Sequence, residues 1–352
     1  MLLWNLGAVN EWLMRWERIF LLLIFPAFSV AASEELPVAP EGFGVPEETL
    51  EKPRLPQPIP GIAPAKPKSL MGFKKIQELT GPPDNPMVMP TDVAIGTKGQ
   101  VYVVDSGNNR ILVFAEDGAY LFAFGSPGEG EGQLLAPVGI TTASDGSVLV
   151  ADRGNHRIQV FDADGNFLKS IATRVGKQHA SPVDVVLGDD EKHLYVTISA
   201  PIHRVFVYNN KGRSDLVWGK PGSNLGDFRY PAAIAVGTHD DVYVVDVFNS
   251  RVQVFDFSGK ILATVGSWGI TPGKLFRPKG VTIREDGMIF VSDSYLGVVQ
   301  AFNPDTRFQA VLGNKGDIGY FDTPTGLATD GKRRLYVSEM LANRVSVLWL
   351  ER

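Results

Sequence analysis

Short apolar runs alternate with turn residues along most of this chain, from residue 72 to its end. The runs are rich in Val, Ile, Phe and Tyr, and segments such as Thr97-Lys98-Gly99 separate them. β-Branched and aromatic residues favour strands, whereas Gly, Asn and Asp favour the turns between them. The first such stretch therefore contains four short predicted strands: Asp92–Ile95, Val101–Asp105, Arg110–Phe114 and Tyr120–Phe124.

This four-strand pattern repeats in phase with two sequence anchors. A proline opens each unit, just before a Gly, Asp or Ala and an aliphatic residue: Pro90, Pro137, Pro182, Pro231, Pro278 and Pro324. An arginine marks a later position in five units: Arg110, Arg157, Arg204, Arg251 and Arg344. A period of roughly 47 residues with four strands is typical of a β-propeller blade. The predicted fold class is therefore all-β, a six-bladed β-propeller of four-stranded blades.

The two ends of the repeat region complement each other. The last unit ends at residues 344–349, which match a third strand, so its fourth strand is missing. Residues 71–81 resemble a fourth strand that has no unit before it. Joining the two removes exposed sheet edges. We therefore expect an N-terminal strand to complete the last blade and close the ring.

A polar motif, Asp-x-x-Asn-x-Arg, lies on the predicted hairpin between the second and third strands. Three units carry it in full, with Asp105, Asn108 and Arg110, then Asp152, Asn155 and Arg157, then Asp246, Asn249 and Arg251. The Asp can accept backbone N–H groups of the turn, and the planar Arg fork can join it to neighbouring carbonyls. We expect a structural role. The third, fifth and sixth units depart from the motif, through drift or because they border a binding site.

These motifs, with the Gly-rich loop before each proline, resemble the hallmark of NHL repeats. The resemblance covers about residues 72–352 and implies a six-bladed propeller. It implies far less about function, because this fold hosts lyases, RNA binders, receptor modules and scaffolds.

The N-terminus reads as a targeting segment. Arg15 and Arg18 precede an apolar run that ends in Val30-Ala31-Ala32, so residues 1–32 have the three parts of a signal peptide. The alternative is a retained membrane anchor, although the run is short for one and Pro26 interrupts it. A start at Met14 instead of Met1 would give a signal of normal length. We expect export to the periplasm or the cell exterior, with membrane attachment if the leader is retained.

Residues 33–68 are predicted to be a proline-rich linker, which favours an extended polyproline conformation and cannot build a core. The propeller then occupies residues 69–352. Lys and Arg number 34 and Asp and Glu 39, so the net charge of −5 argues against a nucleic-acid partner. The absence of cysteine excludes disulfides, thiolate metal sites and a Cys nucleophile.

In a propeller, the loops between blades and the hairpins between second and third strands share one face, here called the loop-rich face. Loops on a rigid ring concentrate binding residues, and aromatic residues with Arg are typical of interface hot spots. The candidate ligand-binding residues are Arg229, Trp268, Arg277, Tyr295, His203 and Lys279. Against this, we expect the aromatic residue before each proline, as in Tyr230, Phe276 and Phe321, to pack between blades.

Two carboxylates enter inner strands where other units have Gly or Ala. Asp92 and Asp184 would lie near the axis of the ring and are candidate ligands for calcium, which prefers oxygen donors. Lys279 lies at the same level and could pair with one of them instead. His156, His179 and His203 fall on the loop-rich face and are a weaker candidate for zinc. The peptidyl-hydroxyglycine lyases, which the propeller resembles, place histidines around the axis, and lactonase-like propellers use acid and amide clusters there.

No complete catalytic constellation is apparent, so we expect a non-catalytic binding or scaffold propeller in the cell envelope. Its loop-rich face would meet a protein, peptide or glycan. The alternative is a metal-dependent lyase or lactonase-like enzyme with its site at the mouth of the axial channel.

Overall fold

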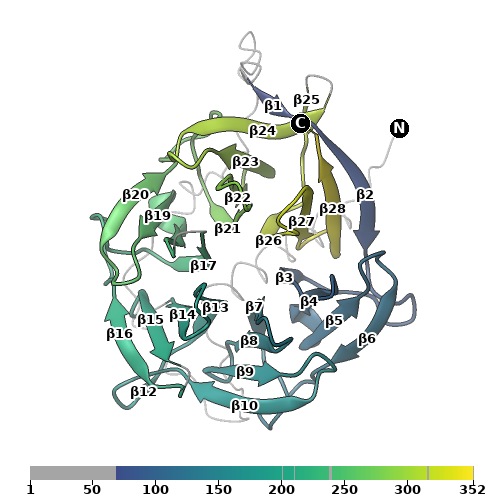
Figure 1. The fold of residues 1–352 in the computed structure, drawn as a ribbon, viewed down its shortest axis with the longest axis vertical. Coiled ribbons are helices and arrows are strands. Elements are labelled where there is room, and N and C mark those ends of the chain that lie inside the picture. The colour runs from purple at the N-terminus through teal and green to yellow at the C-terminus, as the bar shows by residue number, and fades with distance from the viewer. Residues whose placement is uncertain (1–68, 200, 210, 238–239, 315–316, 352) are drawn as a thin grey trace, which may run out of the picture. The chain divides into compact units, whose positions relative to one another are not determined.

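The computed structural model describes residues 69–352, apart from residues 200, 210, 238–239, 315–316 and 352. The predicted leader and linker, residues 1–68, lie outside the described residues. Six β-sheets surround a common axis like the blades of a propeller (Figure 1). The predicted fold class is confirmed. Among the residues described, no helix is long and apolar enough to cross a membrane.

The strands run outward from the axis in each blade. Blades 1 to 3 consist of β3 (Pro90–Ile95), β4 (Val101–Asp105), β5 (Arg110–Phe114) and β6 (Tyr120–Phe124); β7 (Pro137–Thr142), β8 (Val148–Asp152), β9 (Arg157–Phe161) and β10 (Phe167–Ala172); and β13 (Pro182–Leu187), β14 (His193–Ile198), β15 (Arg204–Asn209) and β16 (Ser214–Trp218). Blades 4 to 6 consist of β17 (Pro231–Val236), β18 (Val242–Asp246), β19 (Arg251–Phe255) and β20 (Ile261–Val265); β21 (Pro278–Ile283), β22 (Ile289–Asp293), β23 (Val298–Phe302) and β24 (Phe308–Asn314); and β26 (Pro324–Thr329), β27 (Arg334–Glu339), β28 (Arg344–Leu350) and β2 (Phe73–Leu79).

A few short elements decorate the blades. The remaining strands are β1 (Leu70–Met71), β11 (Arg174–Val175), β12 (Gln178–His179) and β25 (Asp317–Ile318). Single 3-10 turns, η2 (Ser106–Asn108) and η3 (Val247–Asn249), form part of the hairpins of blades 1 and 4. Each ends in a left-handed residue, Asn109 or Ser250, which directs the chain into the third strand.

The ring is closed by the N-terminal strand, as predicted. β2 pairs antiparallel with β28, with Phe73 opposite Leu350 and Leu79 opposite Val345. β1 adds a short parallel pairing to β24 of blade 5, so the chain bridges the last two blades before it enters blade 6. This closure leaves blade 6 with the same four strands as the other blades.

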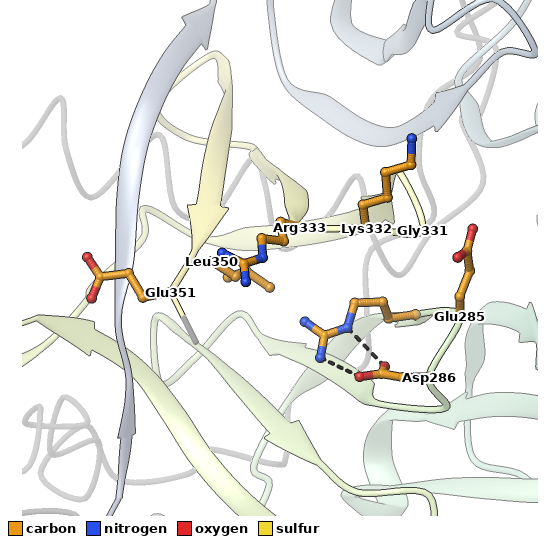
Figure 2. Close-up of a pocket in the computed structure, with 8 residues that line it drawn as sticks. Glu285, Asp286, Gly331, Lys332, Arg333, Leu350 and Glu351 are labelled. Carbon is orange, nitrogen blue, oxygen red and sulfur yellow. Dashed lines mark hydrogen bonds and ion pairs between the residues drawn. The ribbon is translucent and has the colours of Figure 1, made fainter.

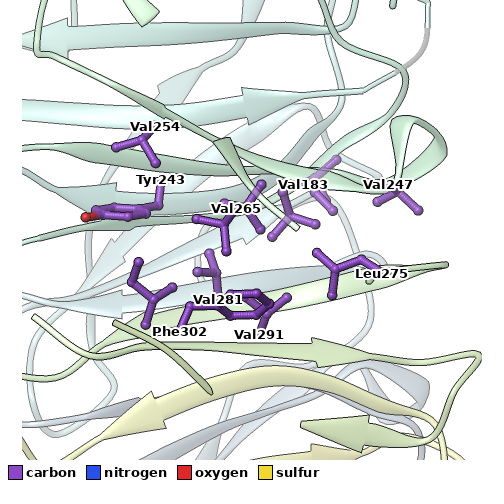
Figure 3. Packing of buried hydrophobic residues seen from close by; sticks show 13 residues of the cluster. Val183, Tyr243, Val247, Val254, Val265, Leu275, Val281, Val291 and Phe302 are labelled. Atoms are coloured by element: carbon purple, nitrogen blue, oxygen red, sulfur yellow. The ribbon is translucent and has the colours of Figure 1, made fainter. Parts of the chain in front are cut away.

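The core lies between neighbouring blades rather than at the axis. In the cluster between blades 4 and 5, Val265, Val281 and Phe302 are buried close together (Figure 3). All five residues of β4, β8, β18 and β22 are buried, because the second strand of a blade packs on both of its faces. Rigid blades of this kind hold the loops that connect them in fixed positions.

Strand order decides which segments share a face. The first strand of each blade (β3, β7, β13, β17, β21 or β26) lines the axis (Figure 1). Because successive strands are antiparallel, the interblade loops and the hairpins between second and third strands lie on the loop-rich face. The other two turns of each blade lie on the opposite face.

Candidate functional site

The hairpin motif joins each blade to the loop that enters it. In blade 1, Asp105 Oδ1 accepts the backbone N–H of Val88 at 2.7 Å, and Oδ2 accepts Asn108 Nδ2 at 2.9 Å and Arg110 Nε at 2.7 Å. Arg110 Nη2 donates to the carbonyl of Asn85 at 2.8 Å. One carboxylate thus satisfies donors from the hairpin and from the preceding loop, an arrangement suited to holding the loop.

Blades 2 and 4 repeat this arrangement. Asp152 accepts Arg157 Nε at 2.8 Å, and Asp246 accepts Arg251 Nε at 2.9 Å. The motif asparagines, Asn155 and Asn249, donate to the same carboxylates. In both blades a glutamine two residues after the arginine, Gln159 or Gln253, also donates to the aspartate. The sequence analysis did not identify these glutamines.

Blades 3, 5 and 6 modify the motif in different ways. In blade 6, Glu339 replaces the aspartate and accepts both Arg344 Nε and the N–H of Asp322. In blade 3, Arg204 keeps its place, but its Nε is buried with no hydrogen-bond acceptor among the described residues. In blade 5, Asp293 accepts backbone N–H groups from both adjoining loops, including those of Arg277 and Tyr295. The blade 5 carboxylate therefore positions two of the candidate binding residues.

The axial carboxylates are acceptors for backbone groups of the next blade. Asp92 Oδ2 accepts the N–H of Ile140 at 3.0 Å. Asp184 Oδ2 accepts the N–H of Ile234 at 2.8 Å, and its Oδ1 accepts that of Val185 at 2.8 Å. Each carboxylate therefore joins one inner strand to its neighbour.

Burial makes both carboxylates hard to ionise. It raises the pKa of Asp184 to about 7, and burial with the nearby charge of Asp184 raises the pKa of Asp92 well above its usual range. No group of three or more His, Asp or Glu side chains that could hold a metal occurs among the described residues. Calcium takes six to eight oxygen ligands, and two carboxyls already bonded to amides do not form that set. The residues present therefore do not fit a calcium site.

Lys279 does not neutralise these acids. No ion pair joins Lys279 to Asp92 or Asp184 within the described part of the chain. Burial and the positive charges of Arg153 and Arg277 lower the pKa of Lys279 to about 8. The pairing alternative is therefore wrong, and the lysine belongs with the cations of the loop-rich face.

The histidines divide into two places. His156 and His179 have ring centroids 5.5 Å apart, and His156 Nδ1 lies 3.0 Å from Ser181 Oγ. His203 Nδ1 instead accepts the backbone N–H of Tyr230 at 3.1 Å. Burial, then the charge of Arg229, lowers the pKa of His203. His203 therefore supports the loop at Tyr230, and the histidine pair alone lacks the three ligands of a protein zinc site.

Most of the candidate binding residues gather on blades 4 and 5. The Arg277 guanidinium lies over the ring of Phe276, with Cζ 4.7 Å from the ring centroid, and Phe276 packs on Tyr295 with centroids 4.5 Å apart. The Lys279 ammonium lies 5.4 Å from the ring centroid of Tyr230. Arg229 precedes Tyr230 on the same loop and is exposed.

The expectation that the aromatic residue before each proline packs between blades is confirmed for Phe321, which is buried between blades 5 and 6, and for Tyr230, which packs against the cluster between blades 4 and 5. The buried residue lies three positions before the proline: Leu134, Phe228, Leu275 and Phe321. Phe276 lies two positions before the proline, is half-buried and contacts Arg277. Tyr230 lies one position before the proline, is half-buried, and contacts Lys279 in addition to the core cluster. Counting the offset from each proline would have separated these positions in the sequence. Tyr230 and Phe276 therefore join the candidate site.

Trp268 lies at a position whose backbone pairing recurs in two other interblade loops, but those loops have a different residue there. It bridges to Leu275 as Pro127 does to Leu134 and Pro221 to Phe228. Its side chain is 71% exposed. A large apolar side chain that stands in solvent where two other loops have proline is available for a partner.

A pocket of about 290 Å³ lies away from these residues. Its lining includes Arg284, Glu285 and Asp286 of the β21–β22 turn and Lys332 and Arg333 of the β26–β27 turn (Figure 2). Both turns are on the opposite face. Arg284 and Asp286 pair with each other across two contacts of 2.9 and 2.6 Å. The pocket is shallow and mixed in charge, and it has no convergent set of reactive groups.

Comparison with known sequences identifies the repeat. A sequence model of the NHL repeat matches residues 87–114, 134–161 and 228–255. These segments contain the three complete Asp-x-x-Asn-x-Arg motifs. They also contain loop residues whose backbone N–H groups the motif aspartates accept. The chain therefore contains NHL repeats within a six-bladed β-propeller.

NHL-repeat relatives share part of this propeller. The protein brain tumor of Drosophila melanogaster is 30% identical over 132 residues, which is 37% of this chain and 12% of that protein. The human E3 ubiquitin-protein ligase NHLRC1 is 28% identical over 102 residues, which is 29% of this chain and 24% of that protein. The alignments thus span only a small part of the relatives' length.

Solved structures of the same fold include enzymes. Virginiamycin B lyase from Staphylococcus aureus, with quinupristin, aligns with a TM-score of 0.58 and 17% identity over 79% of this chain and all of that chain. A gluconolactonase from Xanthomonas campestris aligns with a TM-score of 0.56 and 17% identity over 75% of this chain and 86% of that one. At this identity the likeness concerns the fold alone.

Proposed function

We propose that this NHL-repeat propeller is an exported binding module whose loop-rich face holds a protein or peptide partner. The observation that carries the proposal is a set of exposed apolar side chains on blades 4 to 6 of that face: Phe248, Trp268, Ile270, Tyr295 and Tyr320. Tyr320 is 73% exposed and Trp268 71%. Aromatic side chains with arginine nearby are the usual anchors of protein interfaces.

Two further points support a macromolecular partner. The human relative is a ubiquitin-protein ligase, a class of enzyme that acts on other proteins. The axial acids are bonded to backbone amides and do not form a metal site, so the lyase and lactonase alternative lacks a donor set. We propose a protein or peptide rather than a glycan because arginine beside aromatic rings is typical of protein interfaces. Export is proposed from the leader sequence alone.

Site-directed photo-crosslinking tests the proposal. A photoreactive phenylalanine analogue replaces Trp268 in one variant and Phe257 in the other. Phe257 is 65% exposed and lies on the β19–β20 turn, on the opposite face, so it is a matched control. We expect a discrete cross-linked protein from position 268 and not from position 257. The same products from both positions, or none from 268, would contradict the proposal.

A further inference from the structure

Two cations and four aromatic rings form a row from the channel mouth to the rim of the loop-rich face. At the inner end, the Lys279 ammonium lies 5.4 Å from the Tyr230 ring centroid. The Tyr230 ring in turn lies 5.5 Å from that of Phe248, a residue of η3 that is 43% exposed. At the inner end of this row, the partly buried ammonium of Lys279 therefore lies beside the ring of Tyr230, which packs on that of Phe248.

The outer end of the row is built around Arg277. Its guanidinium carbon lies 5.3 Å from the Phe248 centroid and 4.7 Å from that of Phe276. Arg277 Nη1 donates to the carbonyl of Phe276 at 2.9 Å, which leaves other donors of the guanidinium for a ligand. Tyr295, stacked on Phe276 and 51% exposed, ends the row. The Arg277 guanidinium thus lies within cation–π distance of two rings of the protein itself.

The cations at this mouth lack carboxylate partners in ion pairs. Three cations gather there: Arg153, Arg277 and Lys279. None of them forms an ion pair with a carboxylate among the residues that the structure describes. Arg153 comes from the hairpin of blade 2, opposite blade 5 in the ring (Figure 1). Its charge and that of Arg277 disfavour the protonated form of Lys279.

Lys279 is also an exception within the repeat. The other five units have a small or uncharged residue at the position after the proline: Thr91, Val138, Val183, Ala232 and Thr325. A lysine there is desolvated and repelled by its neighbours, so it costs folding stability. Residues that oppose stability in this way are expected at functional sites.

We propose that this mouth binds an acidic peptide segment of the partner protein. The carboxylate would lie beside Lys279 and Arg277, and a neighbouring apolar side chain of the peptide would cover Phe248 and Tyr295. The inference rests on the proposed function and names the chemistry of its ligand. Unpaired cations attract a carboxylate, and the flat guanidinium can bind both of its oxygens. The exposed rings beside the cations account for an apolar neighbour of the acid.

Fluorescence anisotropy with the full chain tests this inference. The probe is a labelled nonapeptide in which glutamate alternates with phenylalanine. One matched peptide carries glutamine in place of every glutamate. A second has a free C-terminal carboxylate where the probe is amidated, so the contributions of side-chain and terminal carboxylates can be distinguished. We expect the glutamine peptide to bind at least about tenfold more weakly. Equal binding of the glutamate and glutamine peptides would overturn the inference.

Protein variants locate the ligand. Lys279→Met and Arg277→Gln are each expected to weaken binding of the glutamate peptide by about tenfold or more. The control variants Lys211→Met and Arg213→Gln, on the β15–β16 turn of the opposite face, are expected to bind like the unaltered protein. Lys279→Arg is expected to bind the glutamate peptide with an affinity that stays constant between pH 7 and 9. The affinity of the unaltered protein is expected to fall over the same range. Loss of binding in the control variants as well would contradict the placement.

Two other outcomes would also overturn the inference. One is a single-stranded oligouridylate that binds and loses affinity in the Lys279 and Arg277 variants. The other is a cross-link from the mouth to the glutamate-rich residues 33–51 of the same chain in place of the peptide. If Trp268 captures a partner but Lys279→Met leaves that capture unchanged, the proposed function stands and the acidic ligand is wrong.

Discussion

Arg157 and Arg204 occupy equivalent places in blades 2 and 3 but have different surroundings. Arg157 donates to Asp152 and to two carbonyls of the entering loop. Blade 3 has no aspartate at the matching place, and Arg204 Nε is buried without an acceptor in the described structure. The same residue type therefore stabilises one hairpin and contributes little to the other.

This contrast gives a paired prediction for stability. Arg157→Met leaves the buried Asp152 carboxylate without its cation and is expected to cost about 3 kcal/mol of unfolding free energy. Arg204→Met removes an unsatisfied donor and is expected to change it by less than about 1 kcal/mol. Urea denaturation of both variants measures this difference. Equal losses would mean that the motif does not stabilise the fold through its ion pair.

Lys279 gives a prediction that depends on pH. Its pKa in the folded protein is about 8, below the ordinary value of 10.5, so the unfolded chain holds the proton more tightly. Stability therefore rises as pH increases from about 8 to 10.5, and below pH 8 the charged lysine costs the full amount. Lys279→Met is expected to melt a few degrees higher than the unaltered protein at pH 7.

The advantage of Lys279→Met should shrink between pH 7 and 10, because the unaltered lysine loses its charge in the folded state. Thermal melts at several pH values, with the exposed Lys260→Met as a control, measure this. A Lys279→Met variant that melts lower at pH 7 would show that the ammonium stabilises the fold.

At the scale of elements, β2 decides whether the ring is closed. It supplies the outer strand of blade 6, and its Leu79 packs in a buried cluster with Val345 and Val347 of β28. Without it, β28 becomes an unpaired edge strand, which favours association with other chains. β1 pairs with blade 5 and so holds the start of this segment across the junction.

A chain that begins at Pro90 is therefore expected to aggregate or to melt far below the complete chain. If it fails to fold at all, a second measurement still tests the closure. Lys74 and Trp349 are directly opposed and exposed, and the chain has no other cysteine, so a Lys74→Cys/Trp349→Cys pair can form a single disulfide. The oxidised form is expected to melt above the reduced form. A Pro90 chain as stable as the complete chain would refute the closure.

The sequence predicted the elements better than it predicted the site. Six blades, four strands in each and the closing strand follow from periodic features, because every unit must bury the same positions against its neighbours. Arg277, Tyr295 and Lys279 were also chosen from the sequence. Tyr230 and Phe276 were assigned to the core alone, since only the fold shows that the Tyr230 ring also contacts Lys279 and that the Phe276 ring contacts Arg277. The bonding of Asp92 and Asp184 to amides of the next blade was equally hidden, because it joins residues roughly one blade apart.

At the scale of the whole molecule, net charge and local charge differ. The chain carries −5 overall, yet Arg153, Arg277 and Lys279 meet at one mouth. An acidic protein with a localised cationic site can attract an acidic segment to that site while the rest of its surface repels it. The composition alone therefore excluded a generally basic surface, but it could not reveal this local cationic site.

The leader gives a prediction for the whole chain. If residues 1–32 are a signal peptide, the mature protein begins at Ser33 and is recovered in the periplasm or medium. N-terminal sequencing of the protein isolated from its native cells tests this. Recovery of the intact leader in the membrane fraction would instead identify it as an anchor.

The place of β2 also sets the order in which the ring can form during synthesis. β2 precedes β28 by the entire length of the propeller, so blade 6 cannot be completed until the other five blades have left the ribosome. At about 5–20 residues per second this wait lasts on the order of tens of seconds. Until then the nascent ring is open and β2 has no partner strand. Pairing of β2 with β28 is therefore the last event in the assembly of the blades, and the edge of β2 stays open to other chains until then.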